Sequence, residues 1–205
     1  MYKGDFKAMT HNFFATISRM KYIDRWALMR NSRNESLSEH SLEVAMLSHA
    51  LCVLANVRHG HNLDASRAAL IGLYHDASEI ITGDMPTPVK YYNNKLQEAY
   101  KDVEKIAEYK LLNELPQDLR PHFEDIFKPE DSEEDQYIRR LVKAADKLSA
   151  LIKCIEEEKS GNTEFSTARK TLQASIDKMM DELPEVKDFV YEFLPPYGNT
   201  LDELL

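Results

Sequence analysis

The clearest chemical signal in the sequence is a histidine followed at once by an aspartate. His75 and Asp76 stand near the end of an apolar segment, and a neutral imidazole nitrogen together with an anionic oxygen suits a divalent transition metal. Glu79 follows three residues later and Asp84 comes directly after Gly83, so acid–base groups gather at the same helix end. Because a dipeptide of this kind also arises by chance, the prediction of a metal site depends mainly on the residues around it.

Two prolines, Pro86 and Pro88, follow this cluster. Proline has no backbone N–H and restricts the residue before it to extended conformations. We therefore expect the prolines to end the helix and to fix an extended segment beside its C-terminal end.

Two residues on other predicted helices are candidates to complete a metal site. His40 falls in the first turn of a helix that begins with a capping box of Ser36 and Glu39, and Asp146 falls at the margin of an apolar helical face. Two imidazoles and two carboxylates brought together would suit Mn²⁺, Co²⁺, Fe²⁺, Zn²⁺ or Mg²⁺, with positions left for water and substrate. Spacing alone does not unite them, since a lone histidine usually packs or caps a helix and a lone acid usually faces water.

The elements that must position these residues are predicted to be helices. Apolar residues recur at helical spacing, and no alternating segment is long enough to demand a sheet. Residues 24–33, which contain the only tryptophan, predict a loop or irregular turn. The expected fold is all-α, with helices near residues 11–22, 36–59, 64–75, 97–112, 119–127, 132–161, 164–180 and 185–194.

Composition limits the classes of protein that fit. The chain has 205 residues, no evident linker and no repeat, so we expect one domain over residues 1–205. A net charge of -9 disfavours binding to nucleic acid or to an anionic membrane. Residues 1–14 lack the apolar run of a secretory signal, and no stretch approaches the ~18 apolar residues of a membrane span. Cys52 and Cys154 lack CxxC spacing, which predicts a reduced, cytoplasmic protein with two buried thiols.

Several blocks of the sequence resemble a known family. The segments Ser38-Glu39-His40-Ser41, His75-Asp76 and Ala145-Asp146 are similar to the His...His-Asp...Asp pattern of the HD-domain metal-dependent phosphohydrolases. Longer blocks closely resemble the bacterial YfbR-type 5'-deoxynucleotidases, and the similarity extends from Phe13 to about Phe165. These blocks are Arg25-Trp26 with residues 28–31, residues 74–79, residues 82–84 and residues 86–91.

The resemblance implies a fold, an activity and roles for eight residues. It implies a compact multi-helix HD-domain bundle that binds one divalent metal ion (Co²⁺, Mn²⁺ or similar), forms a homodimer, and releases phosphate from deoxyribonucleoside 5'-monophosphates. Glu79 is expected to activate the attacking water, and Asp84 to assist proton transfer or orient the substrate. Arg25, Trp26, His40 and Asp84 are expected to contact the substrate. The implied metal ligands are His40, His75, Asp76 and Asp146.

Two other functions remain open from the sequence. One is an HD-type phosphohydrolase that acts on a deoxynucleoside triphosphate, a cyclic dinucleotide or an alarmone. Two-metal members of that wider group carry extra histidines before the last aspartate, whereas only His122 lies between Asp76 and Asp146 here. The other is a non-catalytic nucleotide sensor, which Glu79 and Asp84 argue against. Histidines outside the matched pattern are expected to be structural: His11, His49, His59, His61 and His122.

Overall fold

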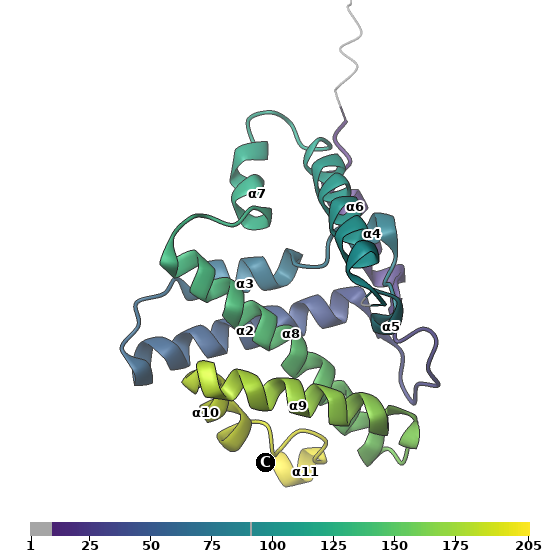
Figure 1. Ribbon diagram of the computed structural model, residues 1–205, viewed down its shortest axis with the longest axis vertical. Coiled ribbons are helices and arrows are strands. Elements are labelled where there is room, and N and C mark those ends of the chain that lie inside the picture. The colour runs from purple at the N-terminus through teal and green to yellow at the C-terminus, as the bar shows by residue number, and fades with distance from the viewer. Residues whose placement is uncertain (1–9, 91) are drawn as a thin grey trace, which may run out of the picture.

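The computed structural model describes residues 10–90 and 92–205, and over these residues it confirms the all-α prediction (Figure 1). The α-helices are α1 (Phe13–Ile17), α2 (Leu37–His59), α3 (Ala65–Tyr74), α4 (Glu79–Thr82), α5 (Thr87–Lys90), α6 (Asn94–Leu112), α7 (Arg120–Phe127), α8 (Glu133–Lys159), α9 (Ser166–Glu182), α10 (Pro184–Glu192) and α11 (Leu201–Leu204). Two 3-10 helices, η1 (Ser18–Tyr22) and η2 (Thr163–Phe165), and two short strands, β1 (Asp24–Arg25) and β2 (Glu35–Ser36), complete the described elements.

Helices α2, α3 and α8 form the centre of the molecule (Figure 1). Leu51 of α2 and Leu148 and Leu151 of α8 are fully buried in the main hydrophobic core. Helices α9 and α10 cover this core on one side, while α4 to α7 lie toward the other end of the molecule (Figure 1). The 3-4 spacing of apolar residues on α8 therefore predicts its buried face correctly.

A glycine sets the distance between α2 and α3. A Cβ atom at Gly72 would lie 3.0 Å from the Cα atom of Ala45 and 3.0 Å from the Oγ atom of Ser48, so a larger residue would push the two helices apart. The close approach brings the C-terminal end of α3, where His75 lies, toward the first turn of α2, where His40 lies.

The predicted helix starts and stops are confirmed where the chain has strong local signals. Ser36 and Glu39 form the capping box at the start of α2, and Gly60 ends that helix with a φ of 72°. Asp64 caps α3 by accepting hydrogen bonds from the backbone N–H groups of Ser66 and Arg67. Ser132 caps α8 in the same way, through the N–H of Asp135.

Two local predictions were wrong. Residues 24–33 are not entirely irregular, because Arg25 of β1 pairs with Glu35 of β2 in a short antiparallel ladder. The segment after Asp84 is not extended, because the carbonyl oxygen of Pro86 accepts hydrogen bonds from the N–H groups of Val89 and Lys90 and so forms the helical turn α5. Proline is tolerated in a first helical turn, where the N–H group has no helical partner.

Helix α2 also qualifies the expectation about membrane spans. By length and composition it is the one described helix that could cross a membrane, but more than half of its apolar window is buried inside the fold. Cys52 on this helix and Cys154 on α8 are free and buried, as predicted. The expectation that residues 1–14 contain no secretory signal rests partly on residues 1–9, which lie outside the described residues, as does Tyr91 of the matched blocks.

Candidate active site

Three helix segments converge on a cluster of two imidazoles and two carboxylates. The Nε2 atom of His40 lies 3.3 Å from Oδ1 of Asp146 and 3.6 Å from Oδ2 of Asp76. The Nε2 atom of His75 lies 3.0 Å from the same oxygen of Asp76. The structure thus brings together all four residues that were predicted to bind a metal, one from α2, two from the turn after α3 and one from α8.

Hydrogen bonds on the far side of each imidazole fix which nitrogen faces the cluster. Nδ1 of His75 lies 2.7 Å from the carbonyl oxygen of Gly72. A carbonyl oxygen can only accept, so Nδ1 carries a hydrogen, and Nε2 is the nitrogen that faces the cluster and would bind a metal ion after losing its own proton. Nδ1 of His40 lies 3.0 Å from Oγ of Ser149, whose hydroxyl donates to Oε2 of Glu43 at 2.5 Å. Ser149 therefore accepts from His40, and Nε2 of His40 is the nitrogen that faces the cluster.

The donor set fits a divalent metal ion. The Nε2 atoms of His40 and His75 are buried and make no hydrogen bond of adequate geometry, although both lie beside carboxylate oxygens. Buried polar atoms normally find a partner, and two neutral nitrogens with two anionic oxygens match the ligands that Zn²⁺, Mn²⁺, Co²⁺ or Fe²⁺ prefers. The hydrogen bonds to Nδ1 are of the kind that orients a metal-binding histidine.

The charges of His75 and Asp76 change each other's pKa. Burial alone would lower the pKa of His75, but the charge of Asp76 and its contact with the ring outweigh burial and raise the pKa to about 9. Burial would raise the pKa of Asp76, yet His75 and His40 hold it well below its usual value. His75 and Asp76 therefore stabilise each other as an ion pair, and a bound divalent ion would take the place of the proton on Nε2 of His75.

Two further acids lie beside the cluster, as predicted. Glu79, the first residue of α4, is 6% exposed and its Oε2 atom has no hydrogen-bond partner. Burial, with the neighbouring charges of Asp76 and Asp84, raises the pKa of Glu79 to about 9. Asp84 follows Gly83, whose φ of 73° favours glycine. Burial also raises the pKa of Asp84, against the opposing effect of Arg25.

Arg25 and Trp26 lie on the same side of the molecule as these acids. The charges of Glu35, Asp146 and Asp76 raise the pKa of Arg25 above its usual value against the lowering effect of burial. The backbone N–H of Trp26 is close enough to the carboxylate of Asp84 to oppose the rise in its pKa, and the Arg25 guanidinium carbon lies 5.9 Å from the centre of the Trp26 ring. The eight residues singled out in the sequence are therefore neighbours in space.

Sequence reasoning missed three residues that touch this site. Glu43 and Ser149 hold His40 in place, and Glu35 accepts hydrogen bonds from Arg25 and Trp26. Helical spacing was an available signal for two of them, because a residue three positions along a helix shares its face. Glu43 follows His40 by three positions, and Ser149 follows Asp146 by three.

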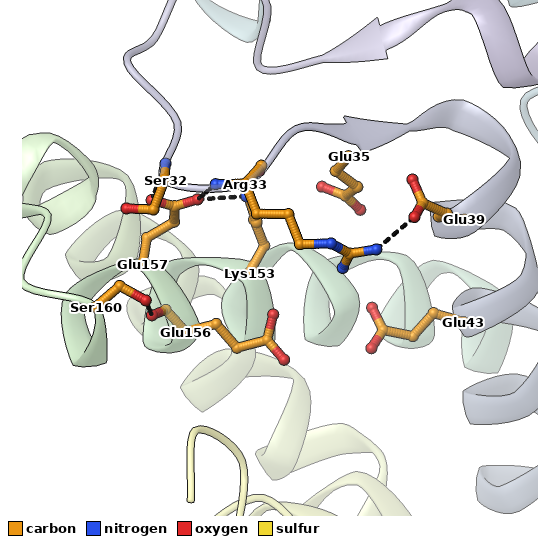
Figure 2. Close-up of a pocket in the computed structure, with 9 residues that line it drawn as sticks. All are labelled: Ser32, Arg33, Glu35, Glu39, Glu43, Lys153, Glu156, Glu157 and Ser160. Atoms are coloured by element: carbon orange, nitrogen blue, oxygen red, sulfur yellow. Dashed lines mark hydrogen bonds and ion pairs between the residues drawn. The ribbon is translucent and has the colours of Figure 1, made fainter. Parts of the chain in front are cut away.

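A cavity of about 290 Å³ lies next to the site rather than within it (Figure 2). Glu35 and Glu43, which support the site residues, line it, whereas none of the eight residues singled out in the sequence does. Its lining is rich in charge: Ser32, Arg33, Glu35, Glu39, Glu43, Lys153, Glu156, Glu157 and Ser160.

Comparison with solved structures agrees with this fold. An HD-domain phosphohydrolase from Listeria innocua superposes with a TM-score of 0.77 at 24% identity, covering 93% of this chain and 90% of that one. The HD phosphohydrolase DatZ of cyanophage S-2L, solved with dA and one catalytic Zn²⁺ ion, superposes with a TM-score of 0.62 at 19% identity, covering 91% of this chain and 96% of that one.

Comparison of sequences identifies the family. The 5'-deoxynucleotidase YfbR of Escherichia coli is 46% identical over 196 residues, which cover 94% of this chain and 95% of the relative. A 5'-deoxynucleotidase of Enterobacter sp. (strain 638) is 45% identical over 193 residues, with the same coverage. A family described as 5'-deoxynucleotidase YfbR-like has a sequence model that matches residues 12–197. The chain therefore belongs to the YfbR-like 5'-deoxynucleotidase family, and it shares its fold with HD-domain phosphohydrolases.

Proposed function

We propose that the cluster around His40 and His75 releases inorganic phosphate from deoxyribonucleoside 5'-monophosphates. As a member of its family the chain is a phosphoric monoester hydrolase, and relatives at 45–46% identity over nearly the full length are 5'-deoxynucleotidases. The observation that carries the proposal is the convergence of two histidines and two aspartates beside the buried acid Glu79.

The residues that would hold one metal ion are His40, His75, Asp76 and Asp146. Cobalt and manganese are our proposed metals, since both accept nitrogen and oxygen ligands together. When bound there, a divalent ion would supply positive charge that favours an acidic water and the ionised form of Glu79, whose pKa is otherwise raised.

Glu79 and Asp84 are proposed to handle protons. In hydrolysis a water oxygen forms a bond to phosphorus, the bond from phosphorus to the 5' oxygen breaks, and the departing 5' oxygen gains a proton. Glu79 would hold the attacking water and accept its proton, because this acid lies next to Asp76 with a free carboxylate oxygen. Asp84 would assist transfer of the proton to the leaving oxygen or orient the substrate.

Arg25 and Trp26 are proposed to bind the nucleotide. A guanidinium offers a fixed fork of donors that suits the oxygens of a phosphate. Trp26 would pack against the sugar and leave a 2'-hydroxyl without room or a hydrogen-bond partner. Burying an unpaired hydroxyl costs ~1–3 kcal/mol, which corresponds to about ten-fold to a hundred-fold preference for the deoxy sugar.

A phosphate-release assay tests this function. The purified chain, with added Mn²⁺, Co²⁺ or Mg²⁺, is given dAMP, dGMP, dCMP, dTMP and dUMP together with the matching ribonucleotides. We expect phosphate from the deoxynucleotides and about ten-fold to a hundred-fold less from the ribonucleotides. Turnover only of a deoxynucleoside triphosphate, cyclic dinucleotide or alarmone would replace the proposed substrate, and binding without turnover of any nucleotide would indicate a sensor.

We also propose that the chain forms a homodimer through the exposed face of α2. Leu42, Met46, Val53 and Val57 are all exposed on this face, and a helix face of this kind normally carries polar residues. The pairs Leu42 with Val57 and Met46 with Val53 share one midpoint, so the apolar stripe reads the same in both directions. Two copies of α2 packed antiparallel would bury matching residues, as a two-fold interface requires.

The remaining expectations concern the cell and larger partners. We propose a cytoplasmic protein, because Cys52 and Cys154 are both free thiols. A net charge of -9 disfavours nucleic acid or an anionic membrane surface as a partner.

A further inference from the structure

The carboxylate of Glu35 contacts three residues of the site, which are Arg25, Trp26 and His40. Its side chain accepts a hydrogen bond from Nη1 of Arg25 at 3.0 Å and another from Nε1 of Trp26 at 3.1 Å, using one carboxylate oxygen for each. Its Oε1 atom also lies 3.7 Å from Nδ1 of His40. Glu35 is 8% exposed, so these contacts are made in a largely dry environment, where the bonds to a carboxylate are strong.

The backbone holds Glu35 opposite Arg25. These two residues are direct partners in the β1–β2 ladder, and directly opposed side chains on one face of a ladder lie within contact distance. The segment that leads into β2 is itself fixed to α8, because the carboxylate of Glu157 accepts hydrogen bonds from the N–H groups of Ser32 and Arg33. The position of the carboxylate is therefore set by the fold and not by a mobile loop.

Trp26 needs such support because its backbone is strained. It is the one non-glycine residue with positive φ among the described residues, at 57°, and a bulky side chain rarely adopts that conformation. Asn31 donates a hydrogen bond to the carbonyl oxygen of Trp26 at 3.2 Å, and the ring of Phe165 meets the indole at 5.3 Å between centroids. The hydrogen bond from Nε1 of Trp26 to Glu35 then fixes the orientation of the indole ring within the site.

We propose that Glu35 is a positioning residue that couples phosphate binding to sugar discrimination. One carboxylate fixes the guanidinium of Arg25 relative to the indole of Trp26. The residue that binds the phosphate and the residue that excludes a 2'-hydroxyl therefore keep a fixed distance and orientation. In a neutral amide an NH₂ group replaces one of the two oxygens, so either Arg25 or Trp26 would face a donor instead of an acceptor. Both functions should therefore weaken together when the carboxylate is lost. This inference rests on the function proposed above.

The test compares Glu35→Gln with Glu39→Gln. Both changes convert a glutamate that lines the same cavity into its amide (Figure 2), but the carboxylate of Glu39 bonds to Ser36 and Arg33 instead of the site residues. For Glu35→Gln we expect the KM for dAMP to rise about ten-fold and the ratio of kcat/KM for dAMP to that for AMP to fall about ten-fold. Metal content should stay that of the wild type, and Glu39→Gln should match the wild type throughout.

A spectroscopic measurement makes the inference independent of turnover. Trp26 is the only tryptophan of the chain, so intrinsic fluorescence reports on its surroundings alone. Glu35→Gln should increase quenching by acrylamide about two-fold while Glu39→Gln leaves it unchanged, as expected when an ordered indole gains freedom.

The outcomes separate the two proposals. If the wild type releases phosphate from dAMP but Glu35→Gln keeps the wild-type KM, sugar preference or quenching, the coupling by Glu35 is wrong and the proposed function stands. Loss of turnover of both nucleotides in equal proportion would also reject it, because a purely structural role predicts that result. If the wild type releases no phosphate from any deoxynucleotide, the proposed function fails, and the quenching of Glu35→Gln then decides alone whether Glu35 positions Trp26.

Discussion

Oδ1 of Asp146 lies 3.3 Å from Nε2 of His40, although α8 and α2 reach this point from distant parts of the chain. Asp146 would be an ordinary acid at the edge of a helix without this contact. Next to the buried Nε2 atom of His40, the carboxylate instead becomes one of the four side chains that we propose as metal ligands. The contact is thus the spatial relationship on which the proposed chemistry depends.

Replacing Asp146 with asparagine should weaken metal binding. The amide keeps the size of the side chain but loses the negative charge that a divalent ion favours, so we expect metal affinity to fall by at least about ten-fold. Metal content after dialysis against a weak chelator, measured by elemental analysis, checks this. Asp102→Asn on the exposed face of α6 is the control and should keep full metal content. An unchanged metal content in Asp146→Asn would remove this residue from the ligand set.

Replacing Glu79 with glutamine should separate binding from catalysis. The amide cannot accept a proton from water, so phosphate release from dAMP should fall by ~10²-fold or more. Metal content and the affinity for dAMP should remain, because Glu79 is not among the proposed ligands. Stopped assays with saturating dAMP measure the loss, and Glu98→Gln on α6 provides a matched control. A rate within a few-fold of the wild type would show that another group accepts the proton.

The parts of this fold that follow local rules could be predicted from the sequence. The capping box of Ser36 and Glu39, the Asp64 cap and the stop at Gly60 each depend on a few neighbouring residues, and each is confirmed. The ladder that pairs Arg25 with Glu35 was missed. Two-residue strands leave no alternating pattern, and their pairing depends on how the intervening turn is attached to α8.

The site likewise contains some features that local sequence rules predict and others that they do not. Closeness in sequence places Glu79 beside Asp76, but no local rule brings Asp146 to His40, and only the resemblance to a family suggested that contact. The left-handed backbone of Trp26 was equally hidden, since its φ of 57° is imposed by tertiary hydrogen bonds and not by its own preference. Residues that position others, such as Glu35, carry no signature of their own in one sequence.

Removing the hydroxyl of Ser149 should weaken metal binding without removing a ligand. Ser149 accepts the hydrogen of Nδ1 of His40 and so keeps Nε2 available. We expect Ser149→Ala to lower metal affinity about ten-fold to a hundred-fold, as for other residues that orient a metal-binding histidine. Isothermal titration calorimetry with Mn²⁺ or Co²⁺ measures the metal affinity. Ser48→Ala is the control, since Ser48 is also buried but its hydroxyl has no hydrogen-bond partner; equal affinities in both variants would reject the role of Ser149.

Glu157 should make stability depend on acid pH. Burial acts to raise its pKa, but hydrogen bonds from Lys153, Ser32 and Asn162 outweigh burial and lower the pKa to about 2 from an ordinary value of 4.5. A carboxylate with a lowered folded-state pKa stabilises the fold above pH 4.5 and loses that contribution as the pH falls from 4.5 toward 2. Glu157→Gln should therefore lower Tm by about 5 °C at pH 7, and the difference from the wild type should shrink below pH 4.5.

Thermal unfolding at a series of pH values checks the prediction for Glu157. Glu156→Gln is the matched control on the same helix, because burial raises the pKa of Glu156 and its ionised form is not stabilised by the fold. That variant should not lose stability at pH 7. A Tm difference for Glu157→Gln that stays constant from pH 7 to pH 3 would contradict the proposed linkage.

Introducing a charge on the exposed face of α2 should dissociate the proposed homodimer. Met46 is 58% exposed in the single chain, and an antiparallel pairing of two α2 helices would bury it against Val53 of the other copy. An aspartate there would lose its hydration without gaining an opposite charge, so Met46→Asp should be monomeric by light scattering at concentrations where the wild type is dimeric. Ile106→Asp is the control, because Ile106 is 55% exposed on α6, outside this face. A dimer that survives Met46→Asp and dissociates with Ile106→Asp would move the interface from α2 to α6.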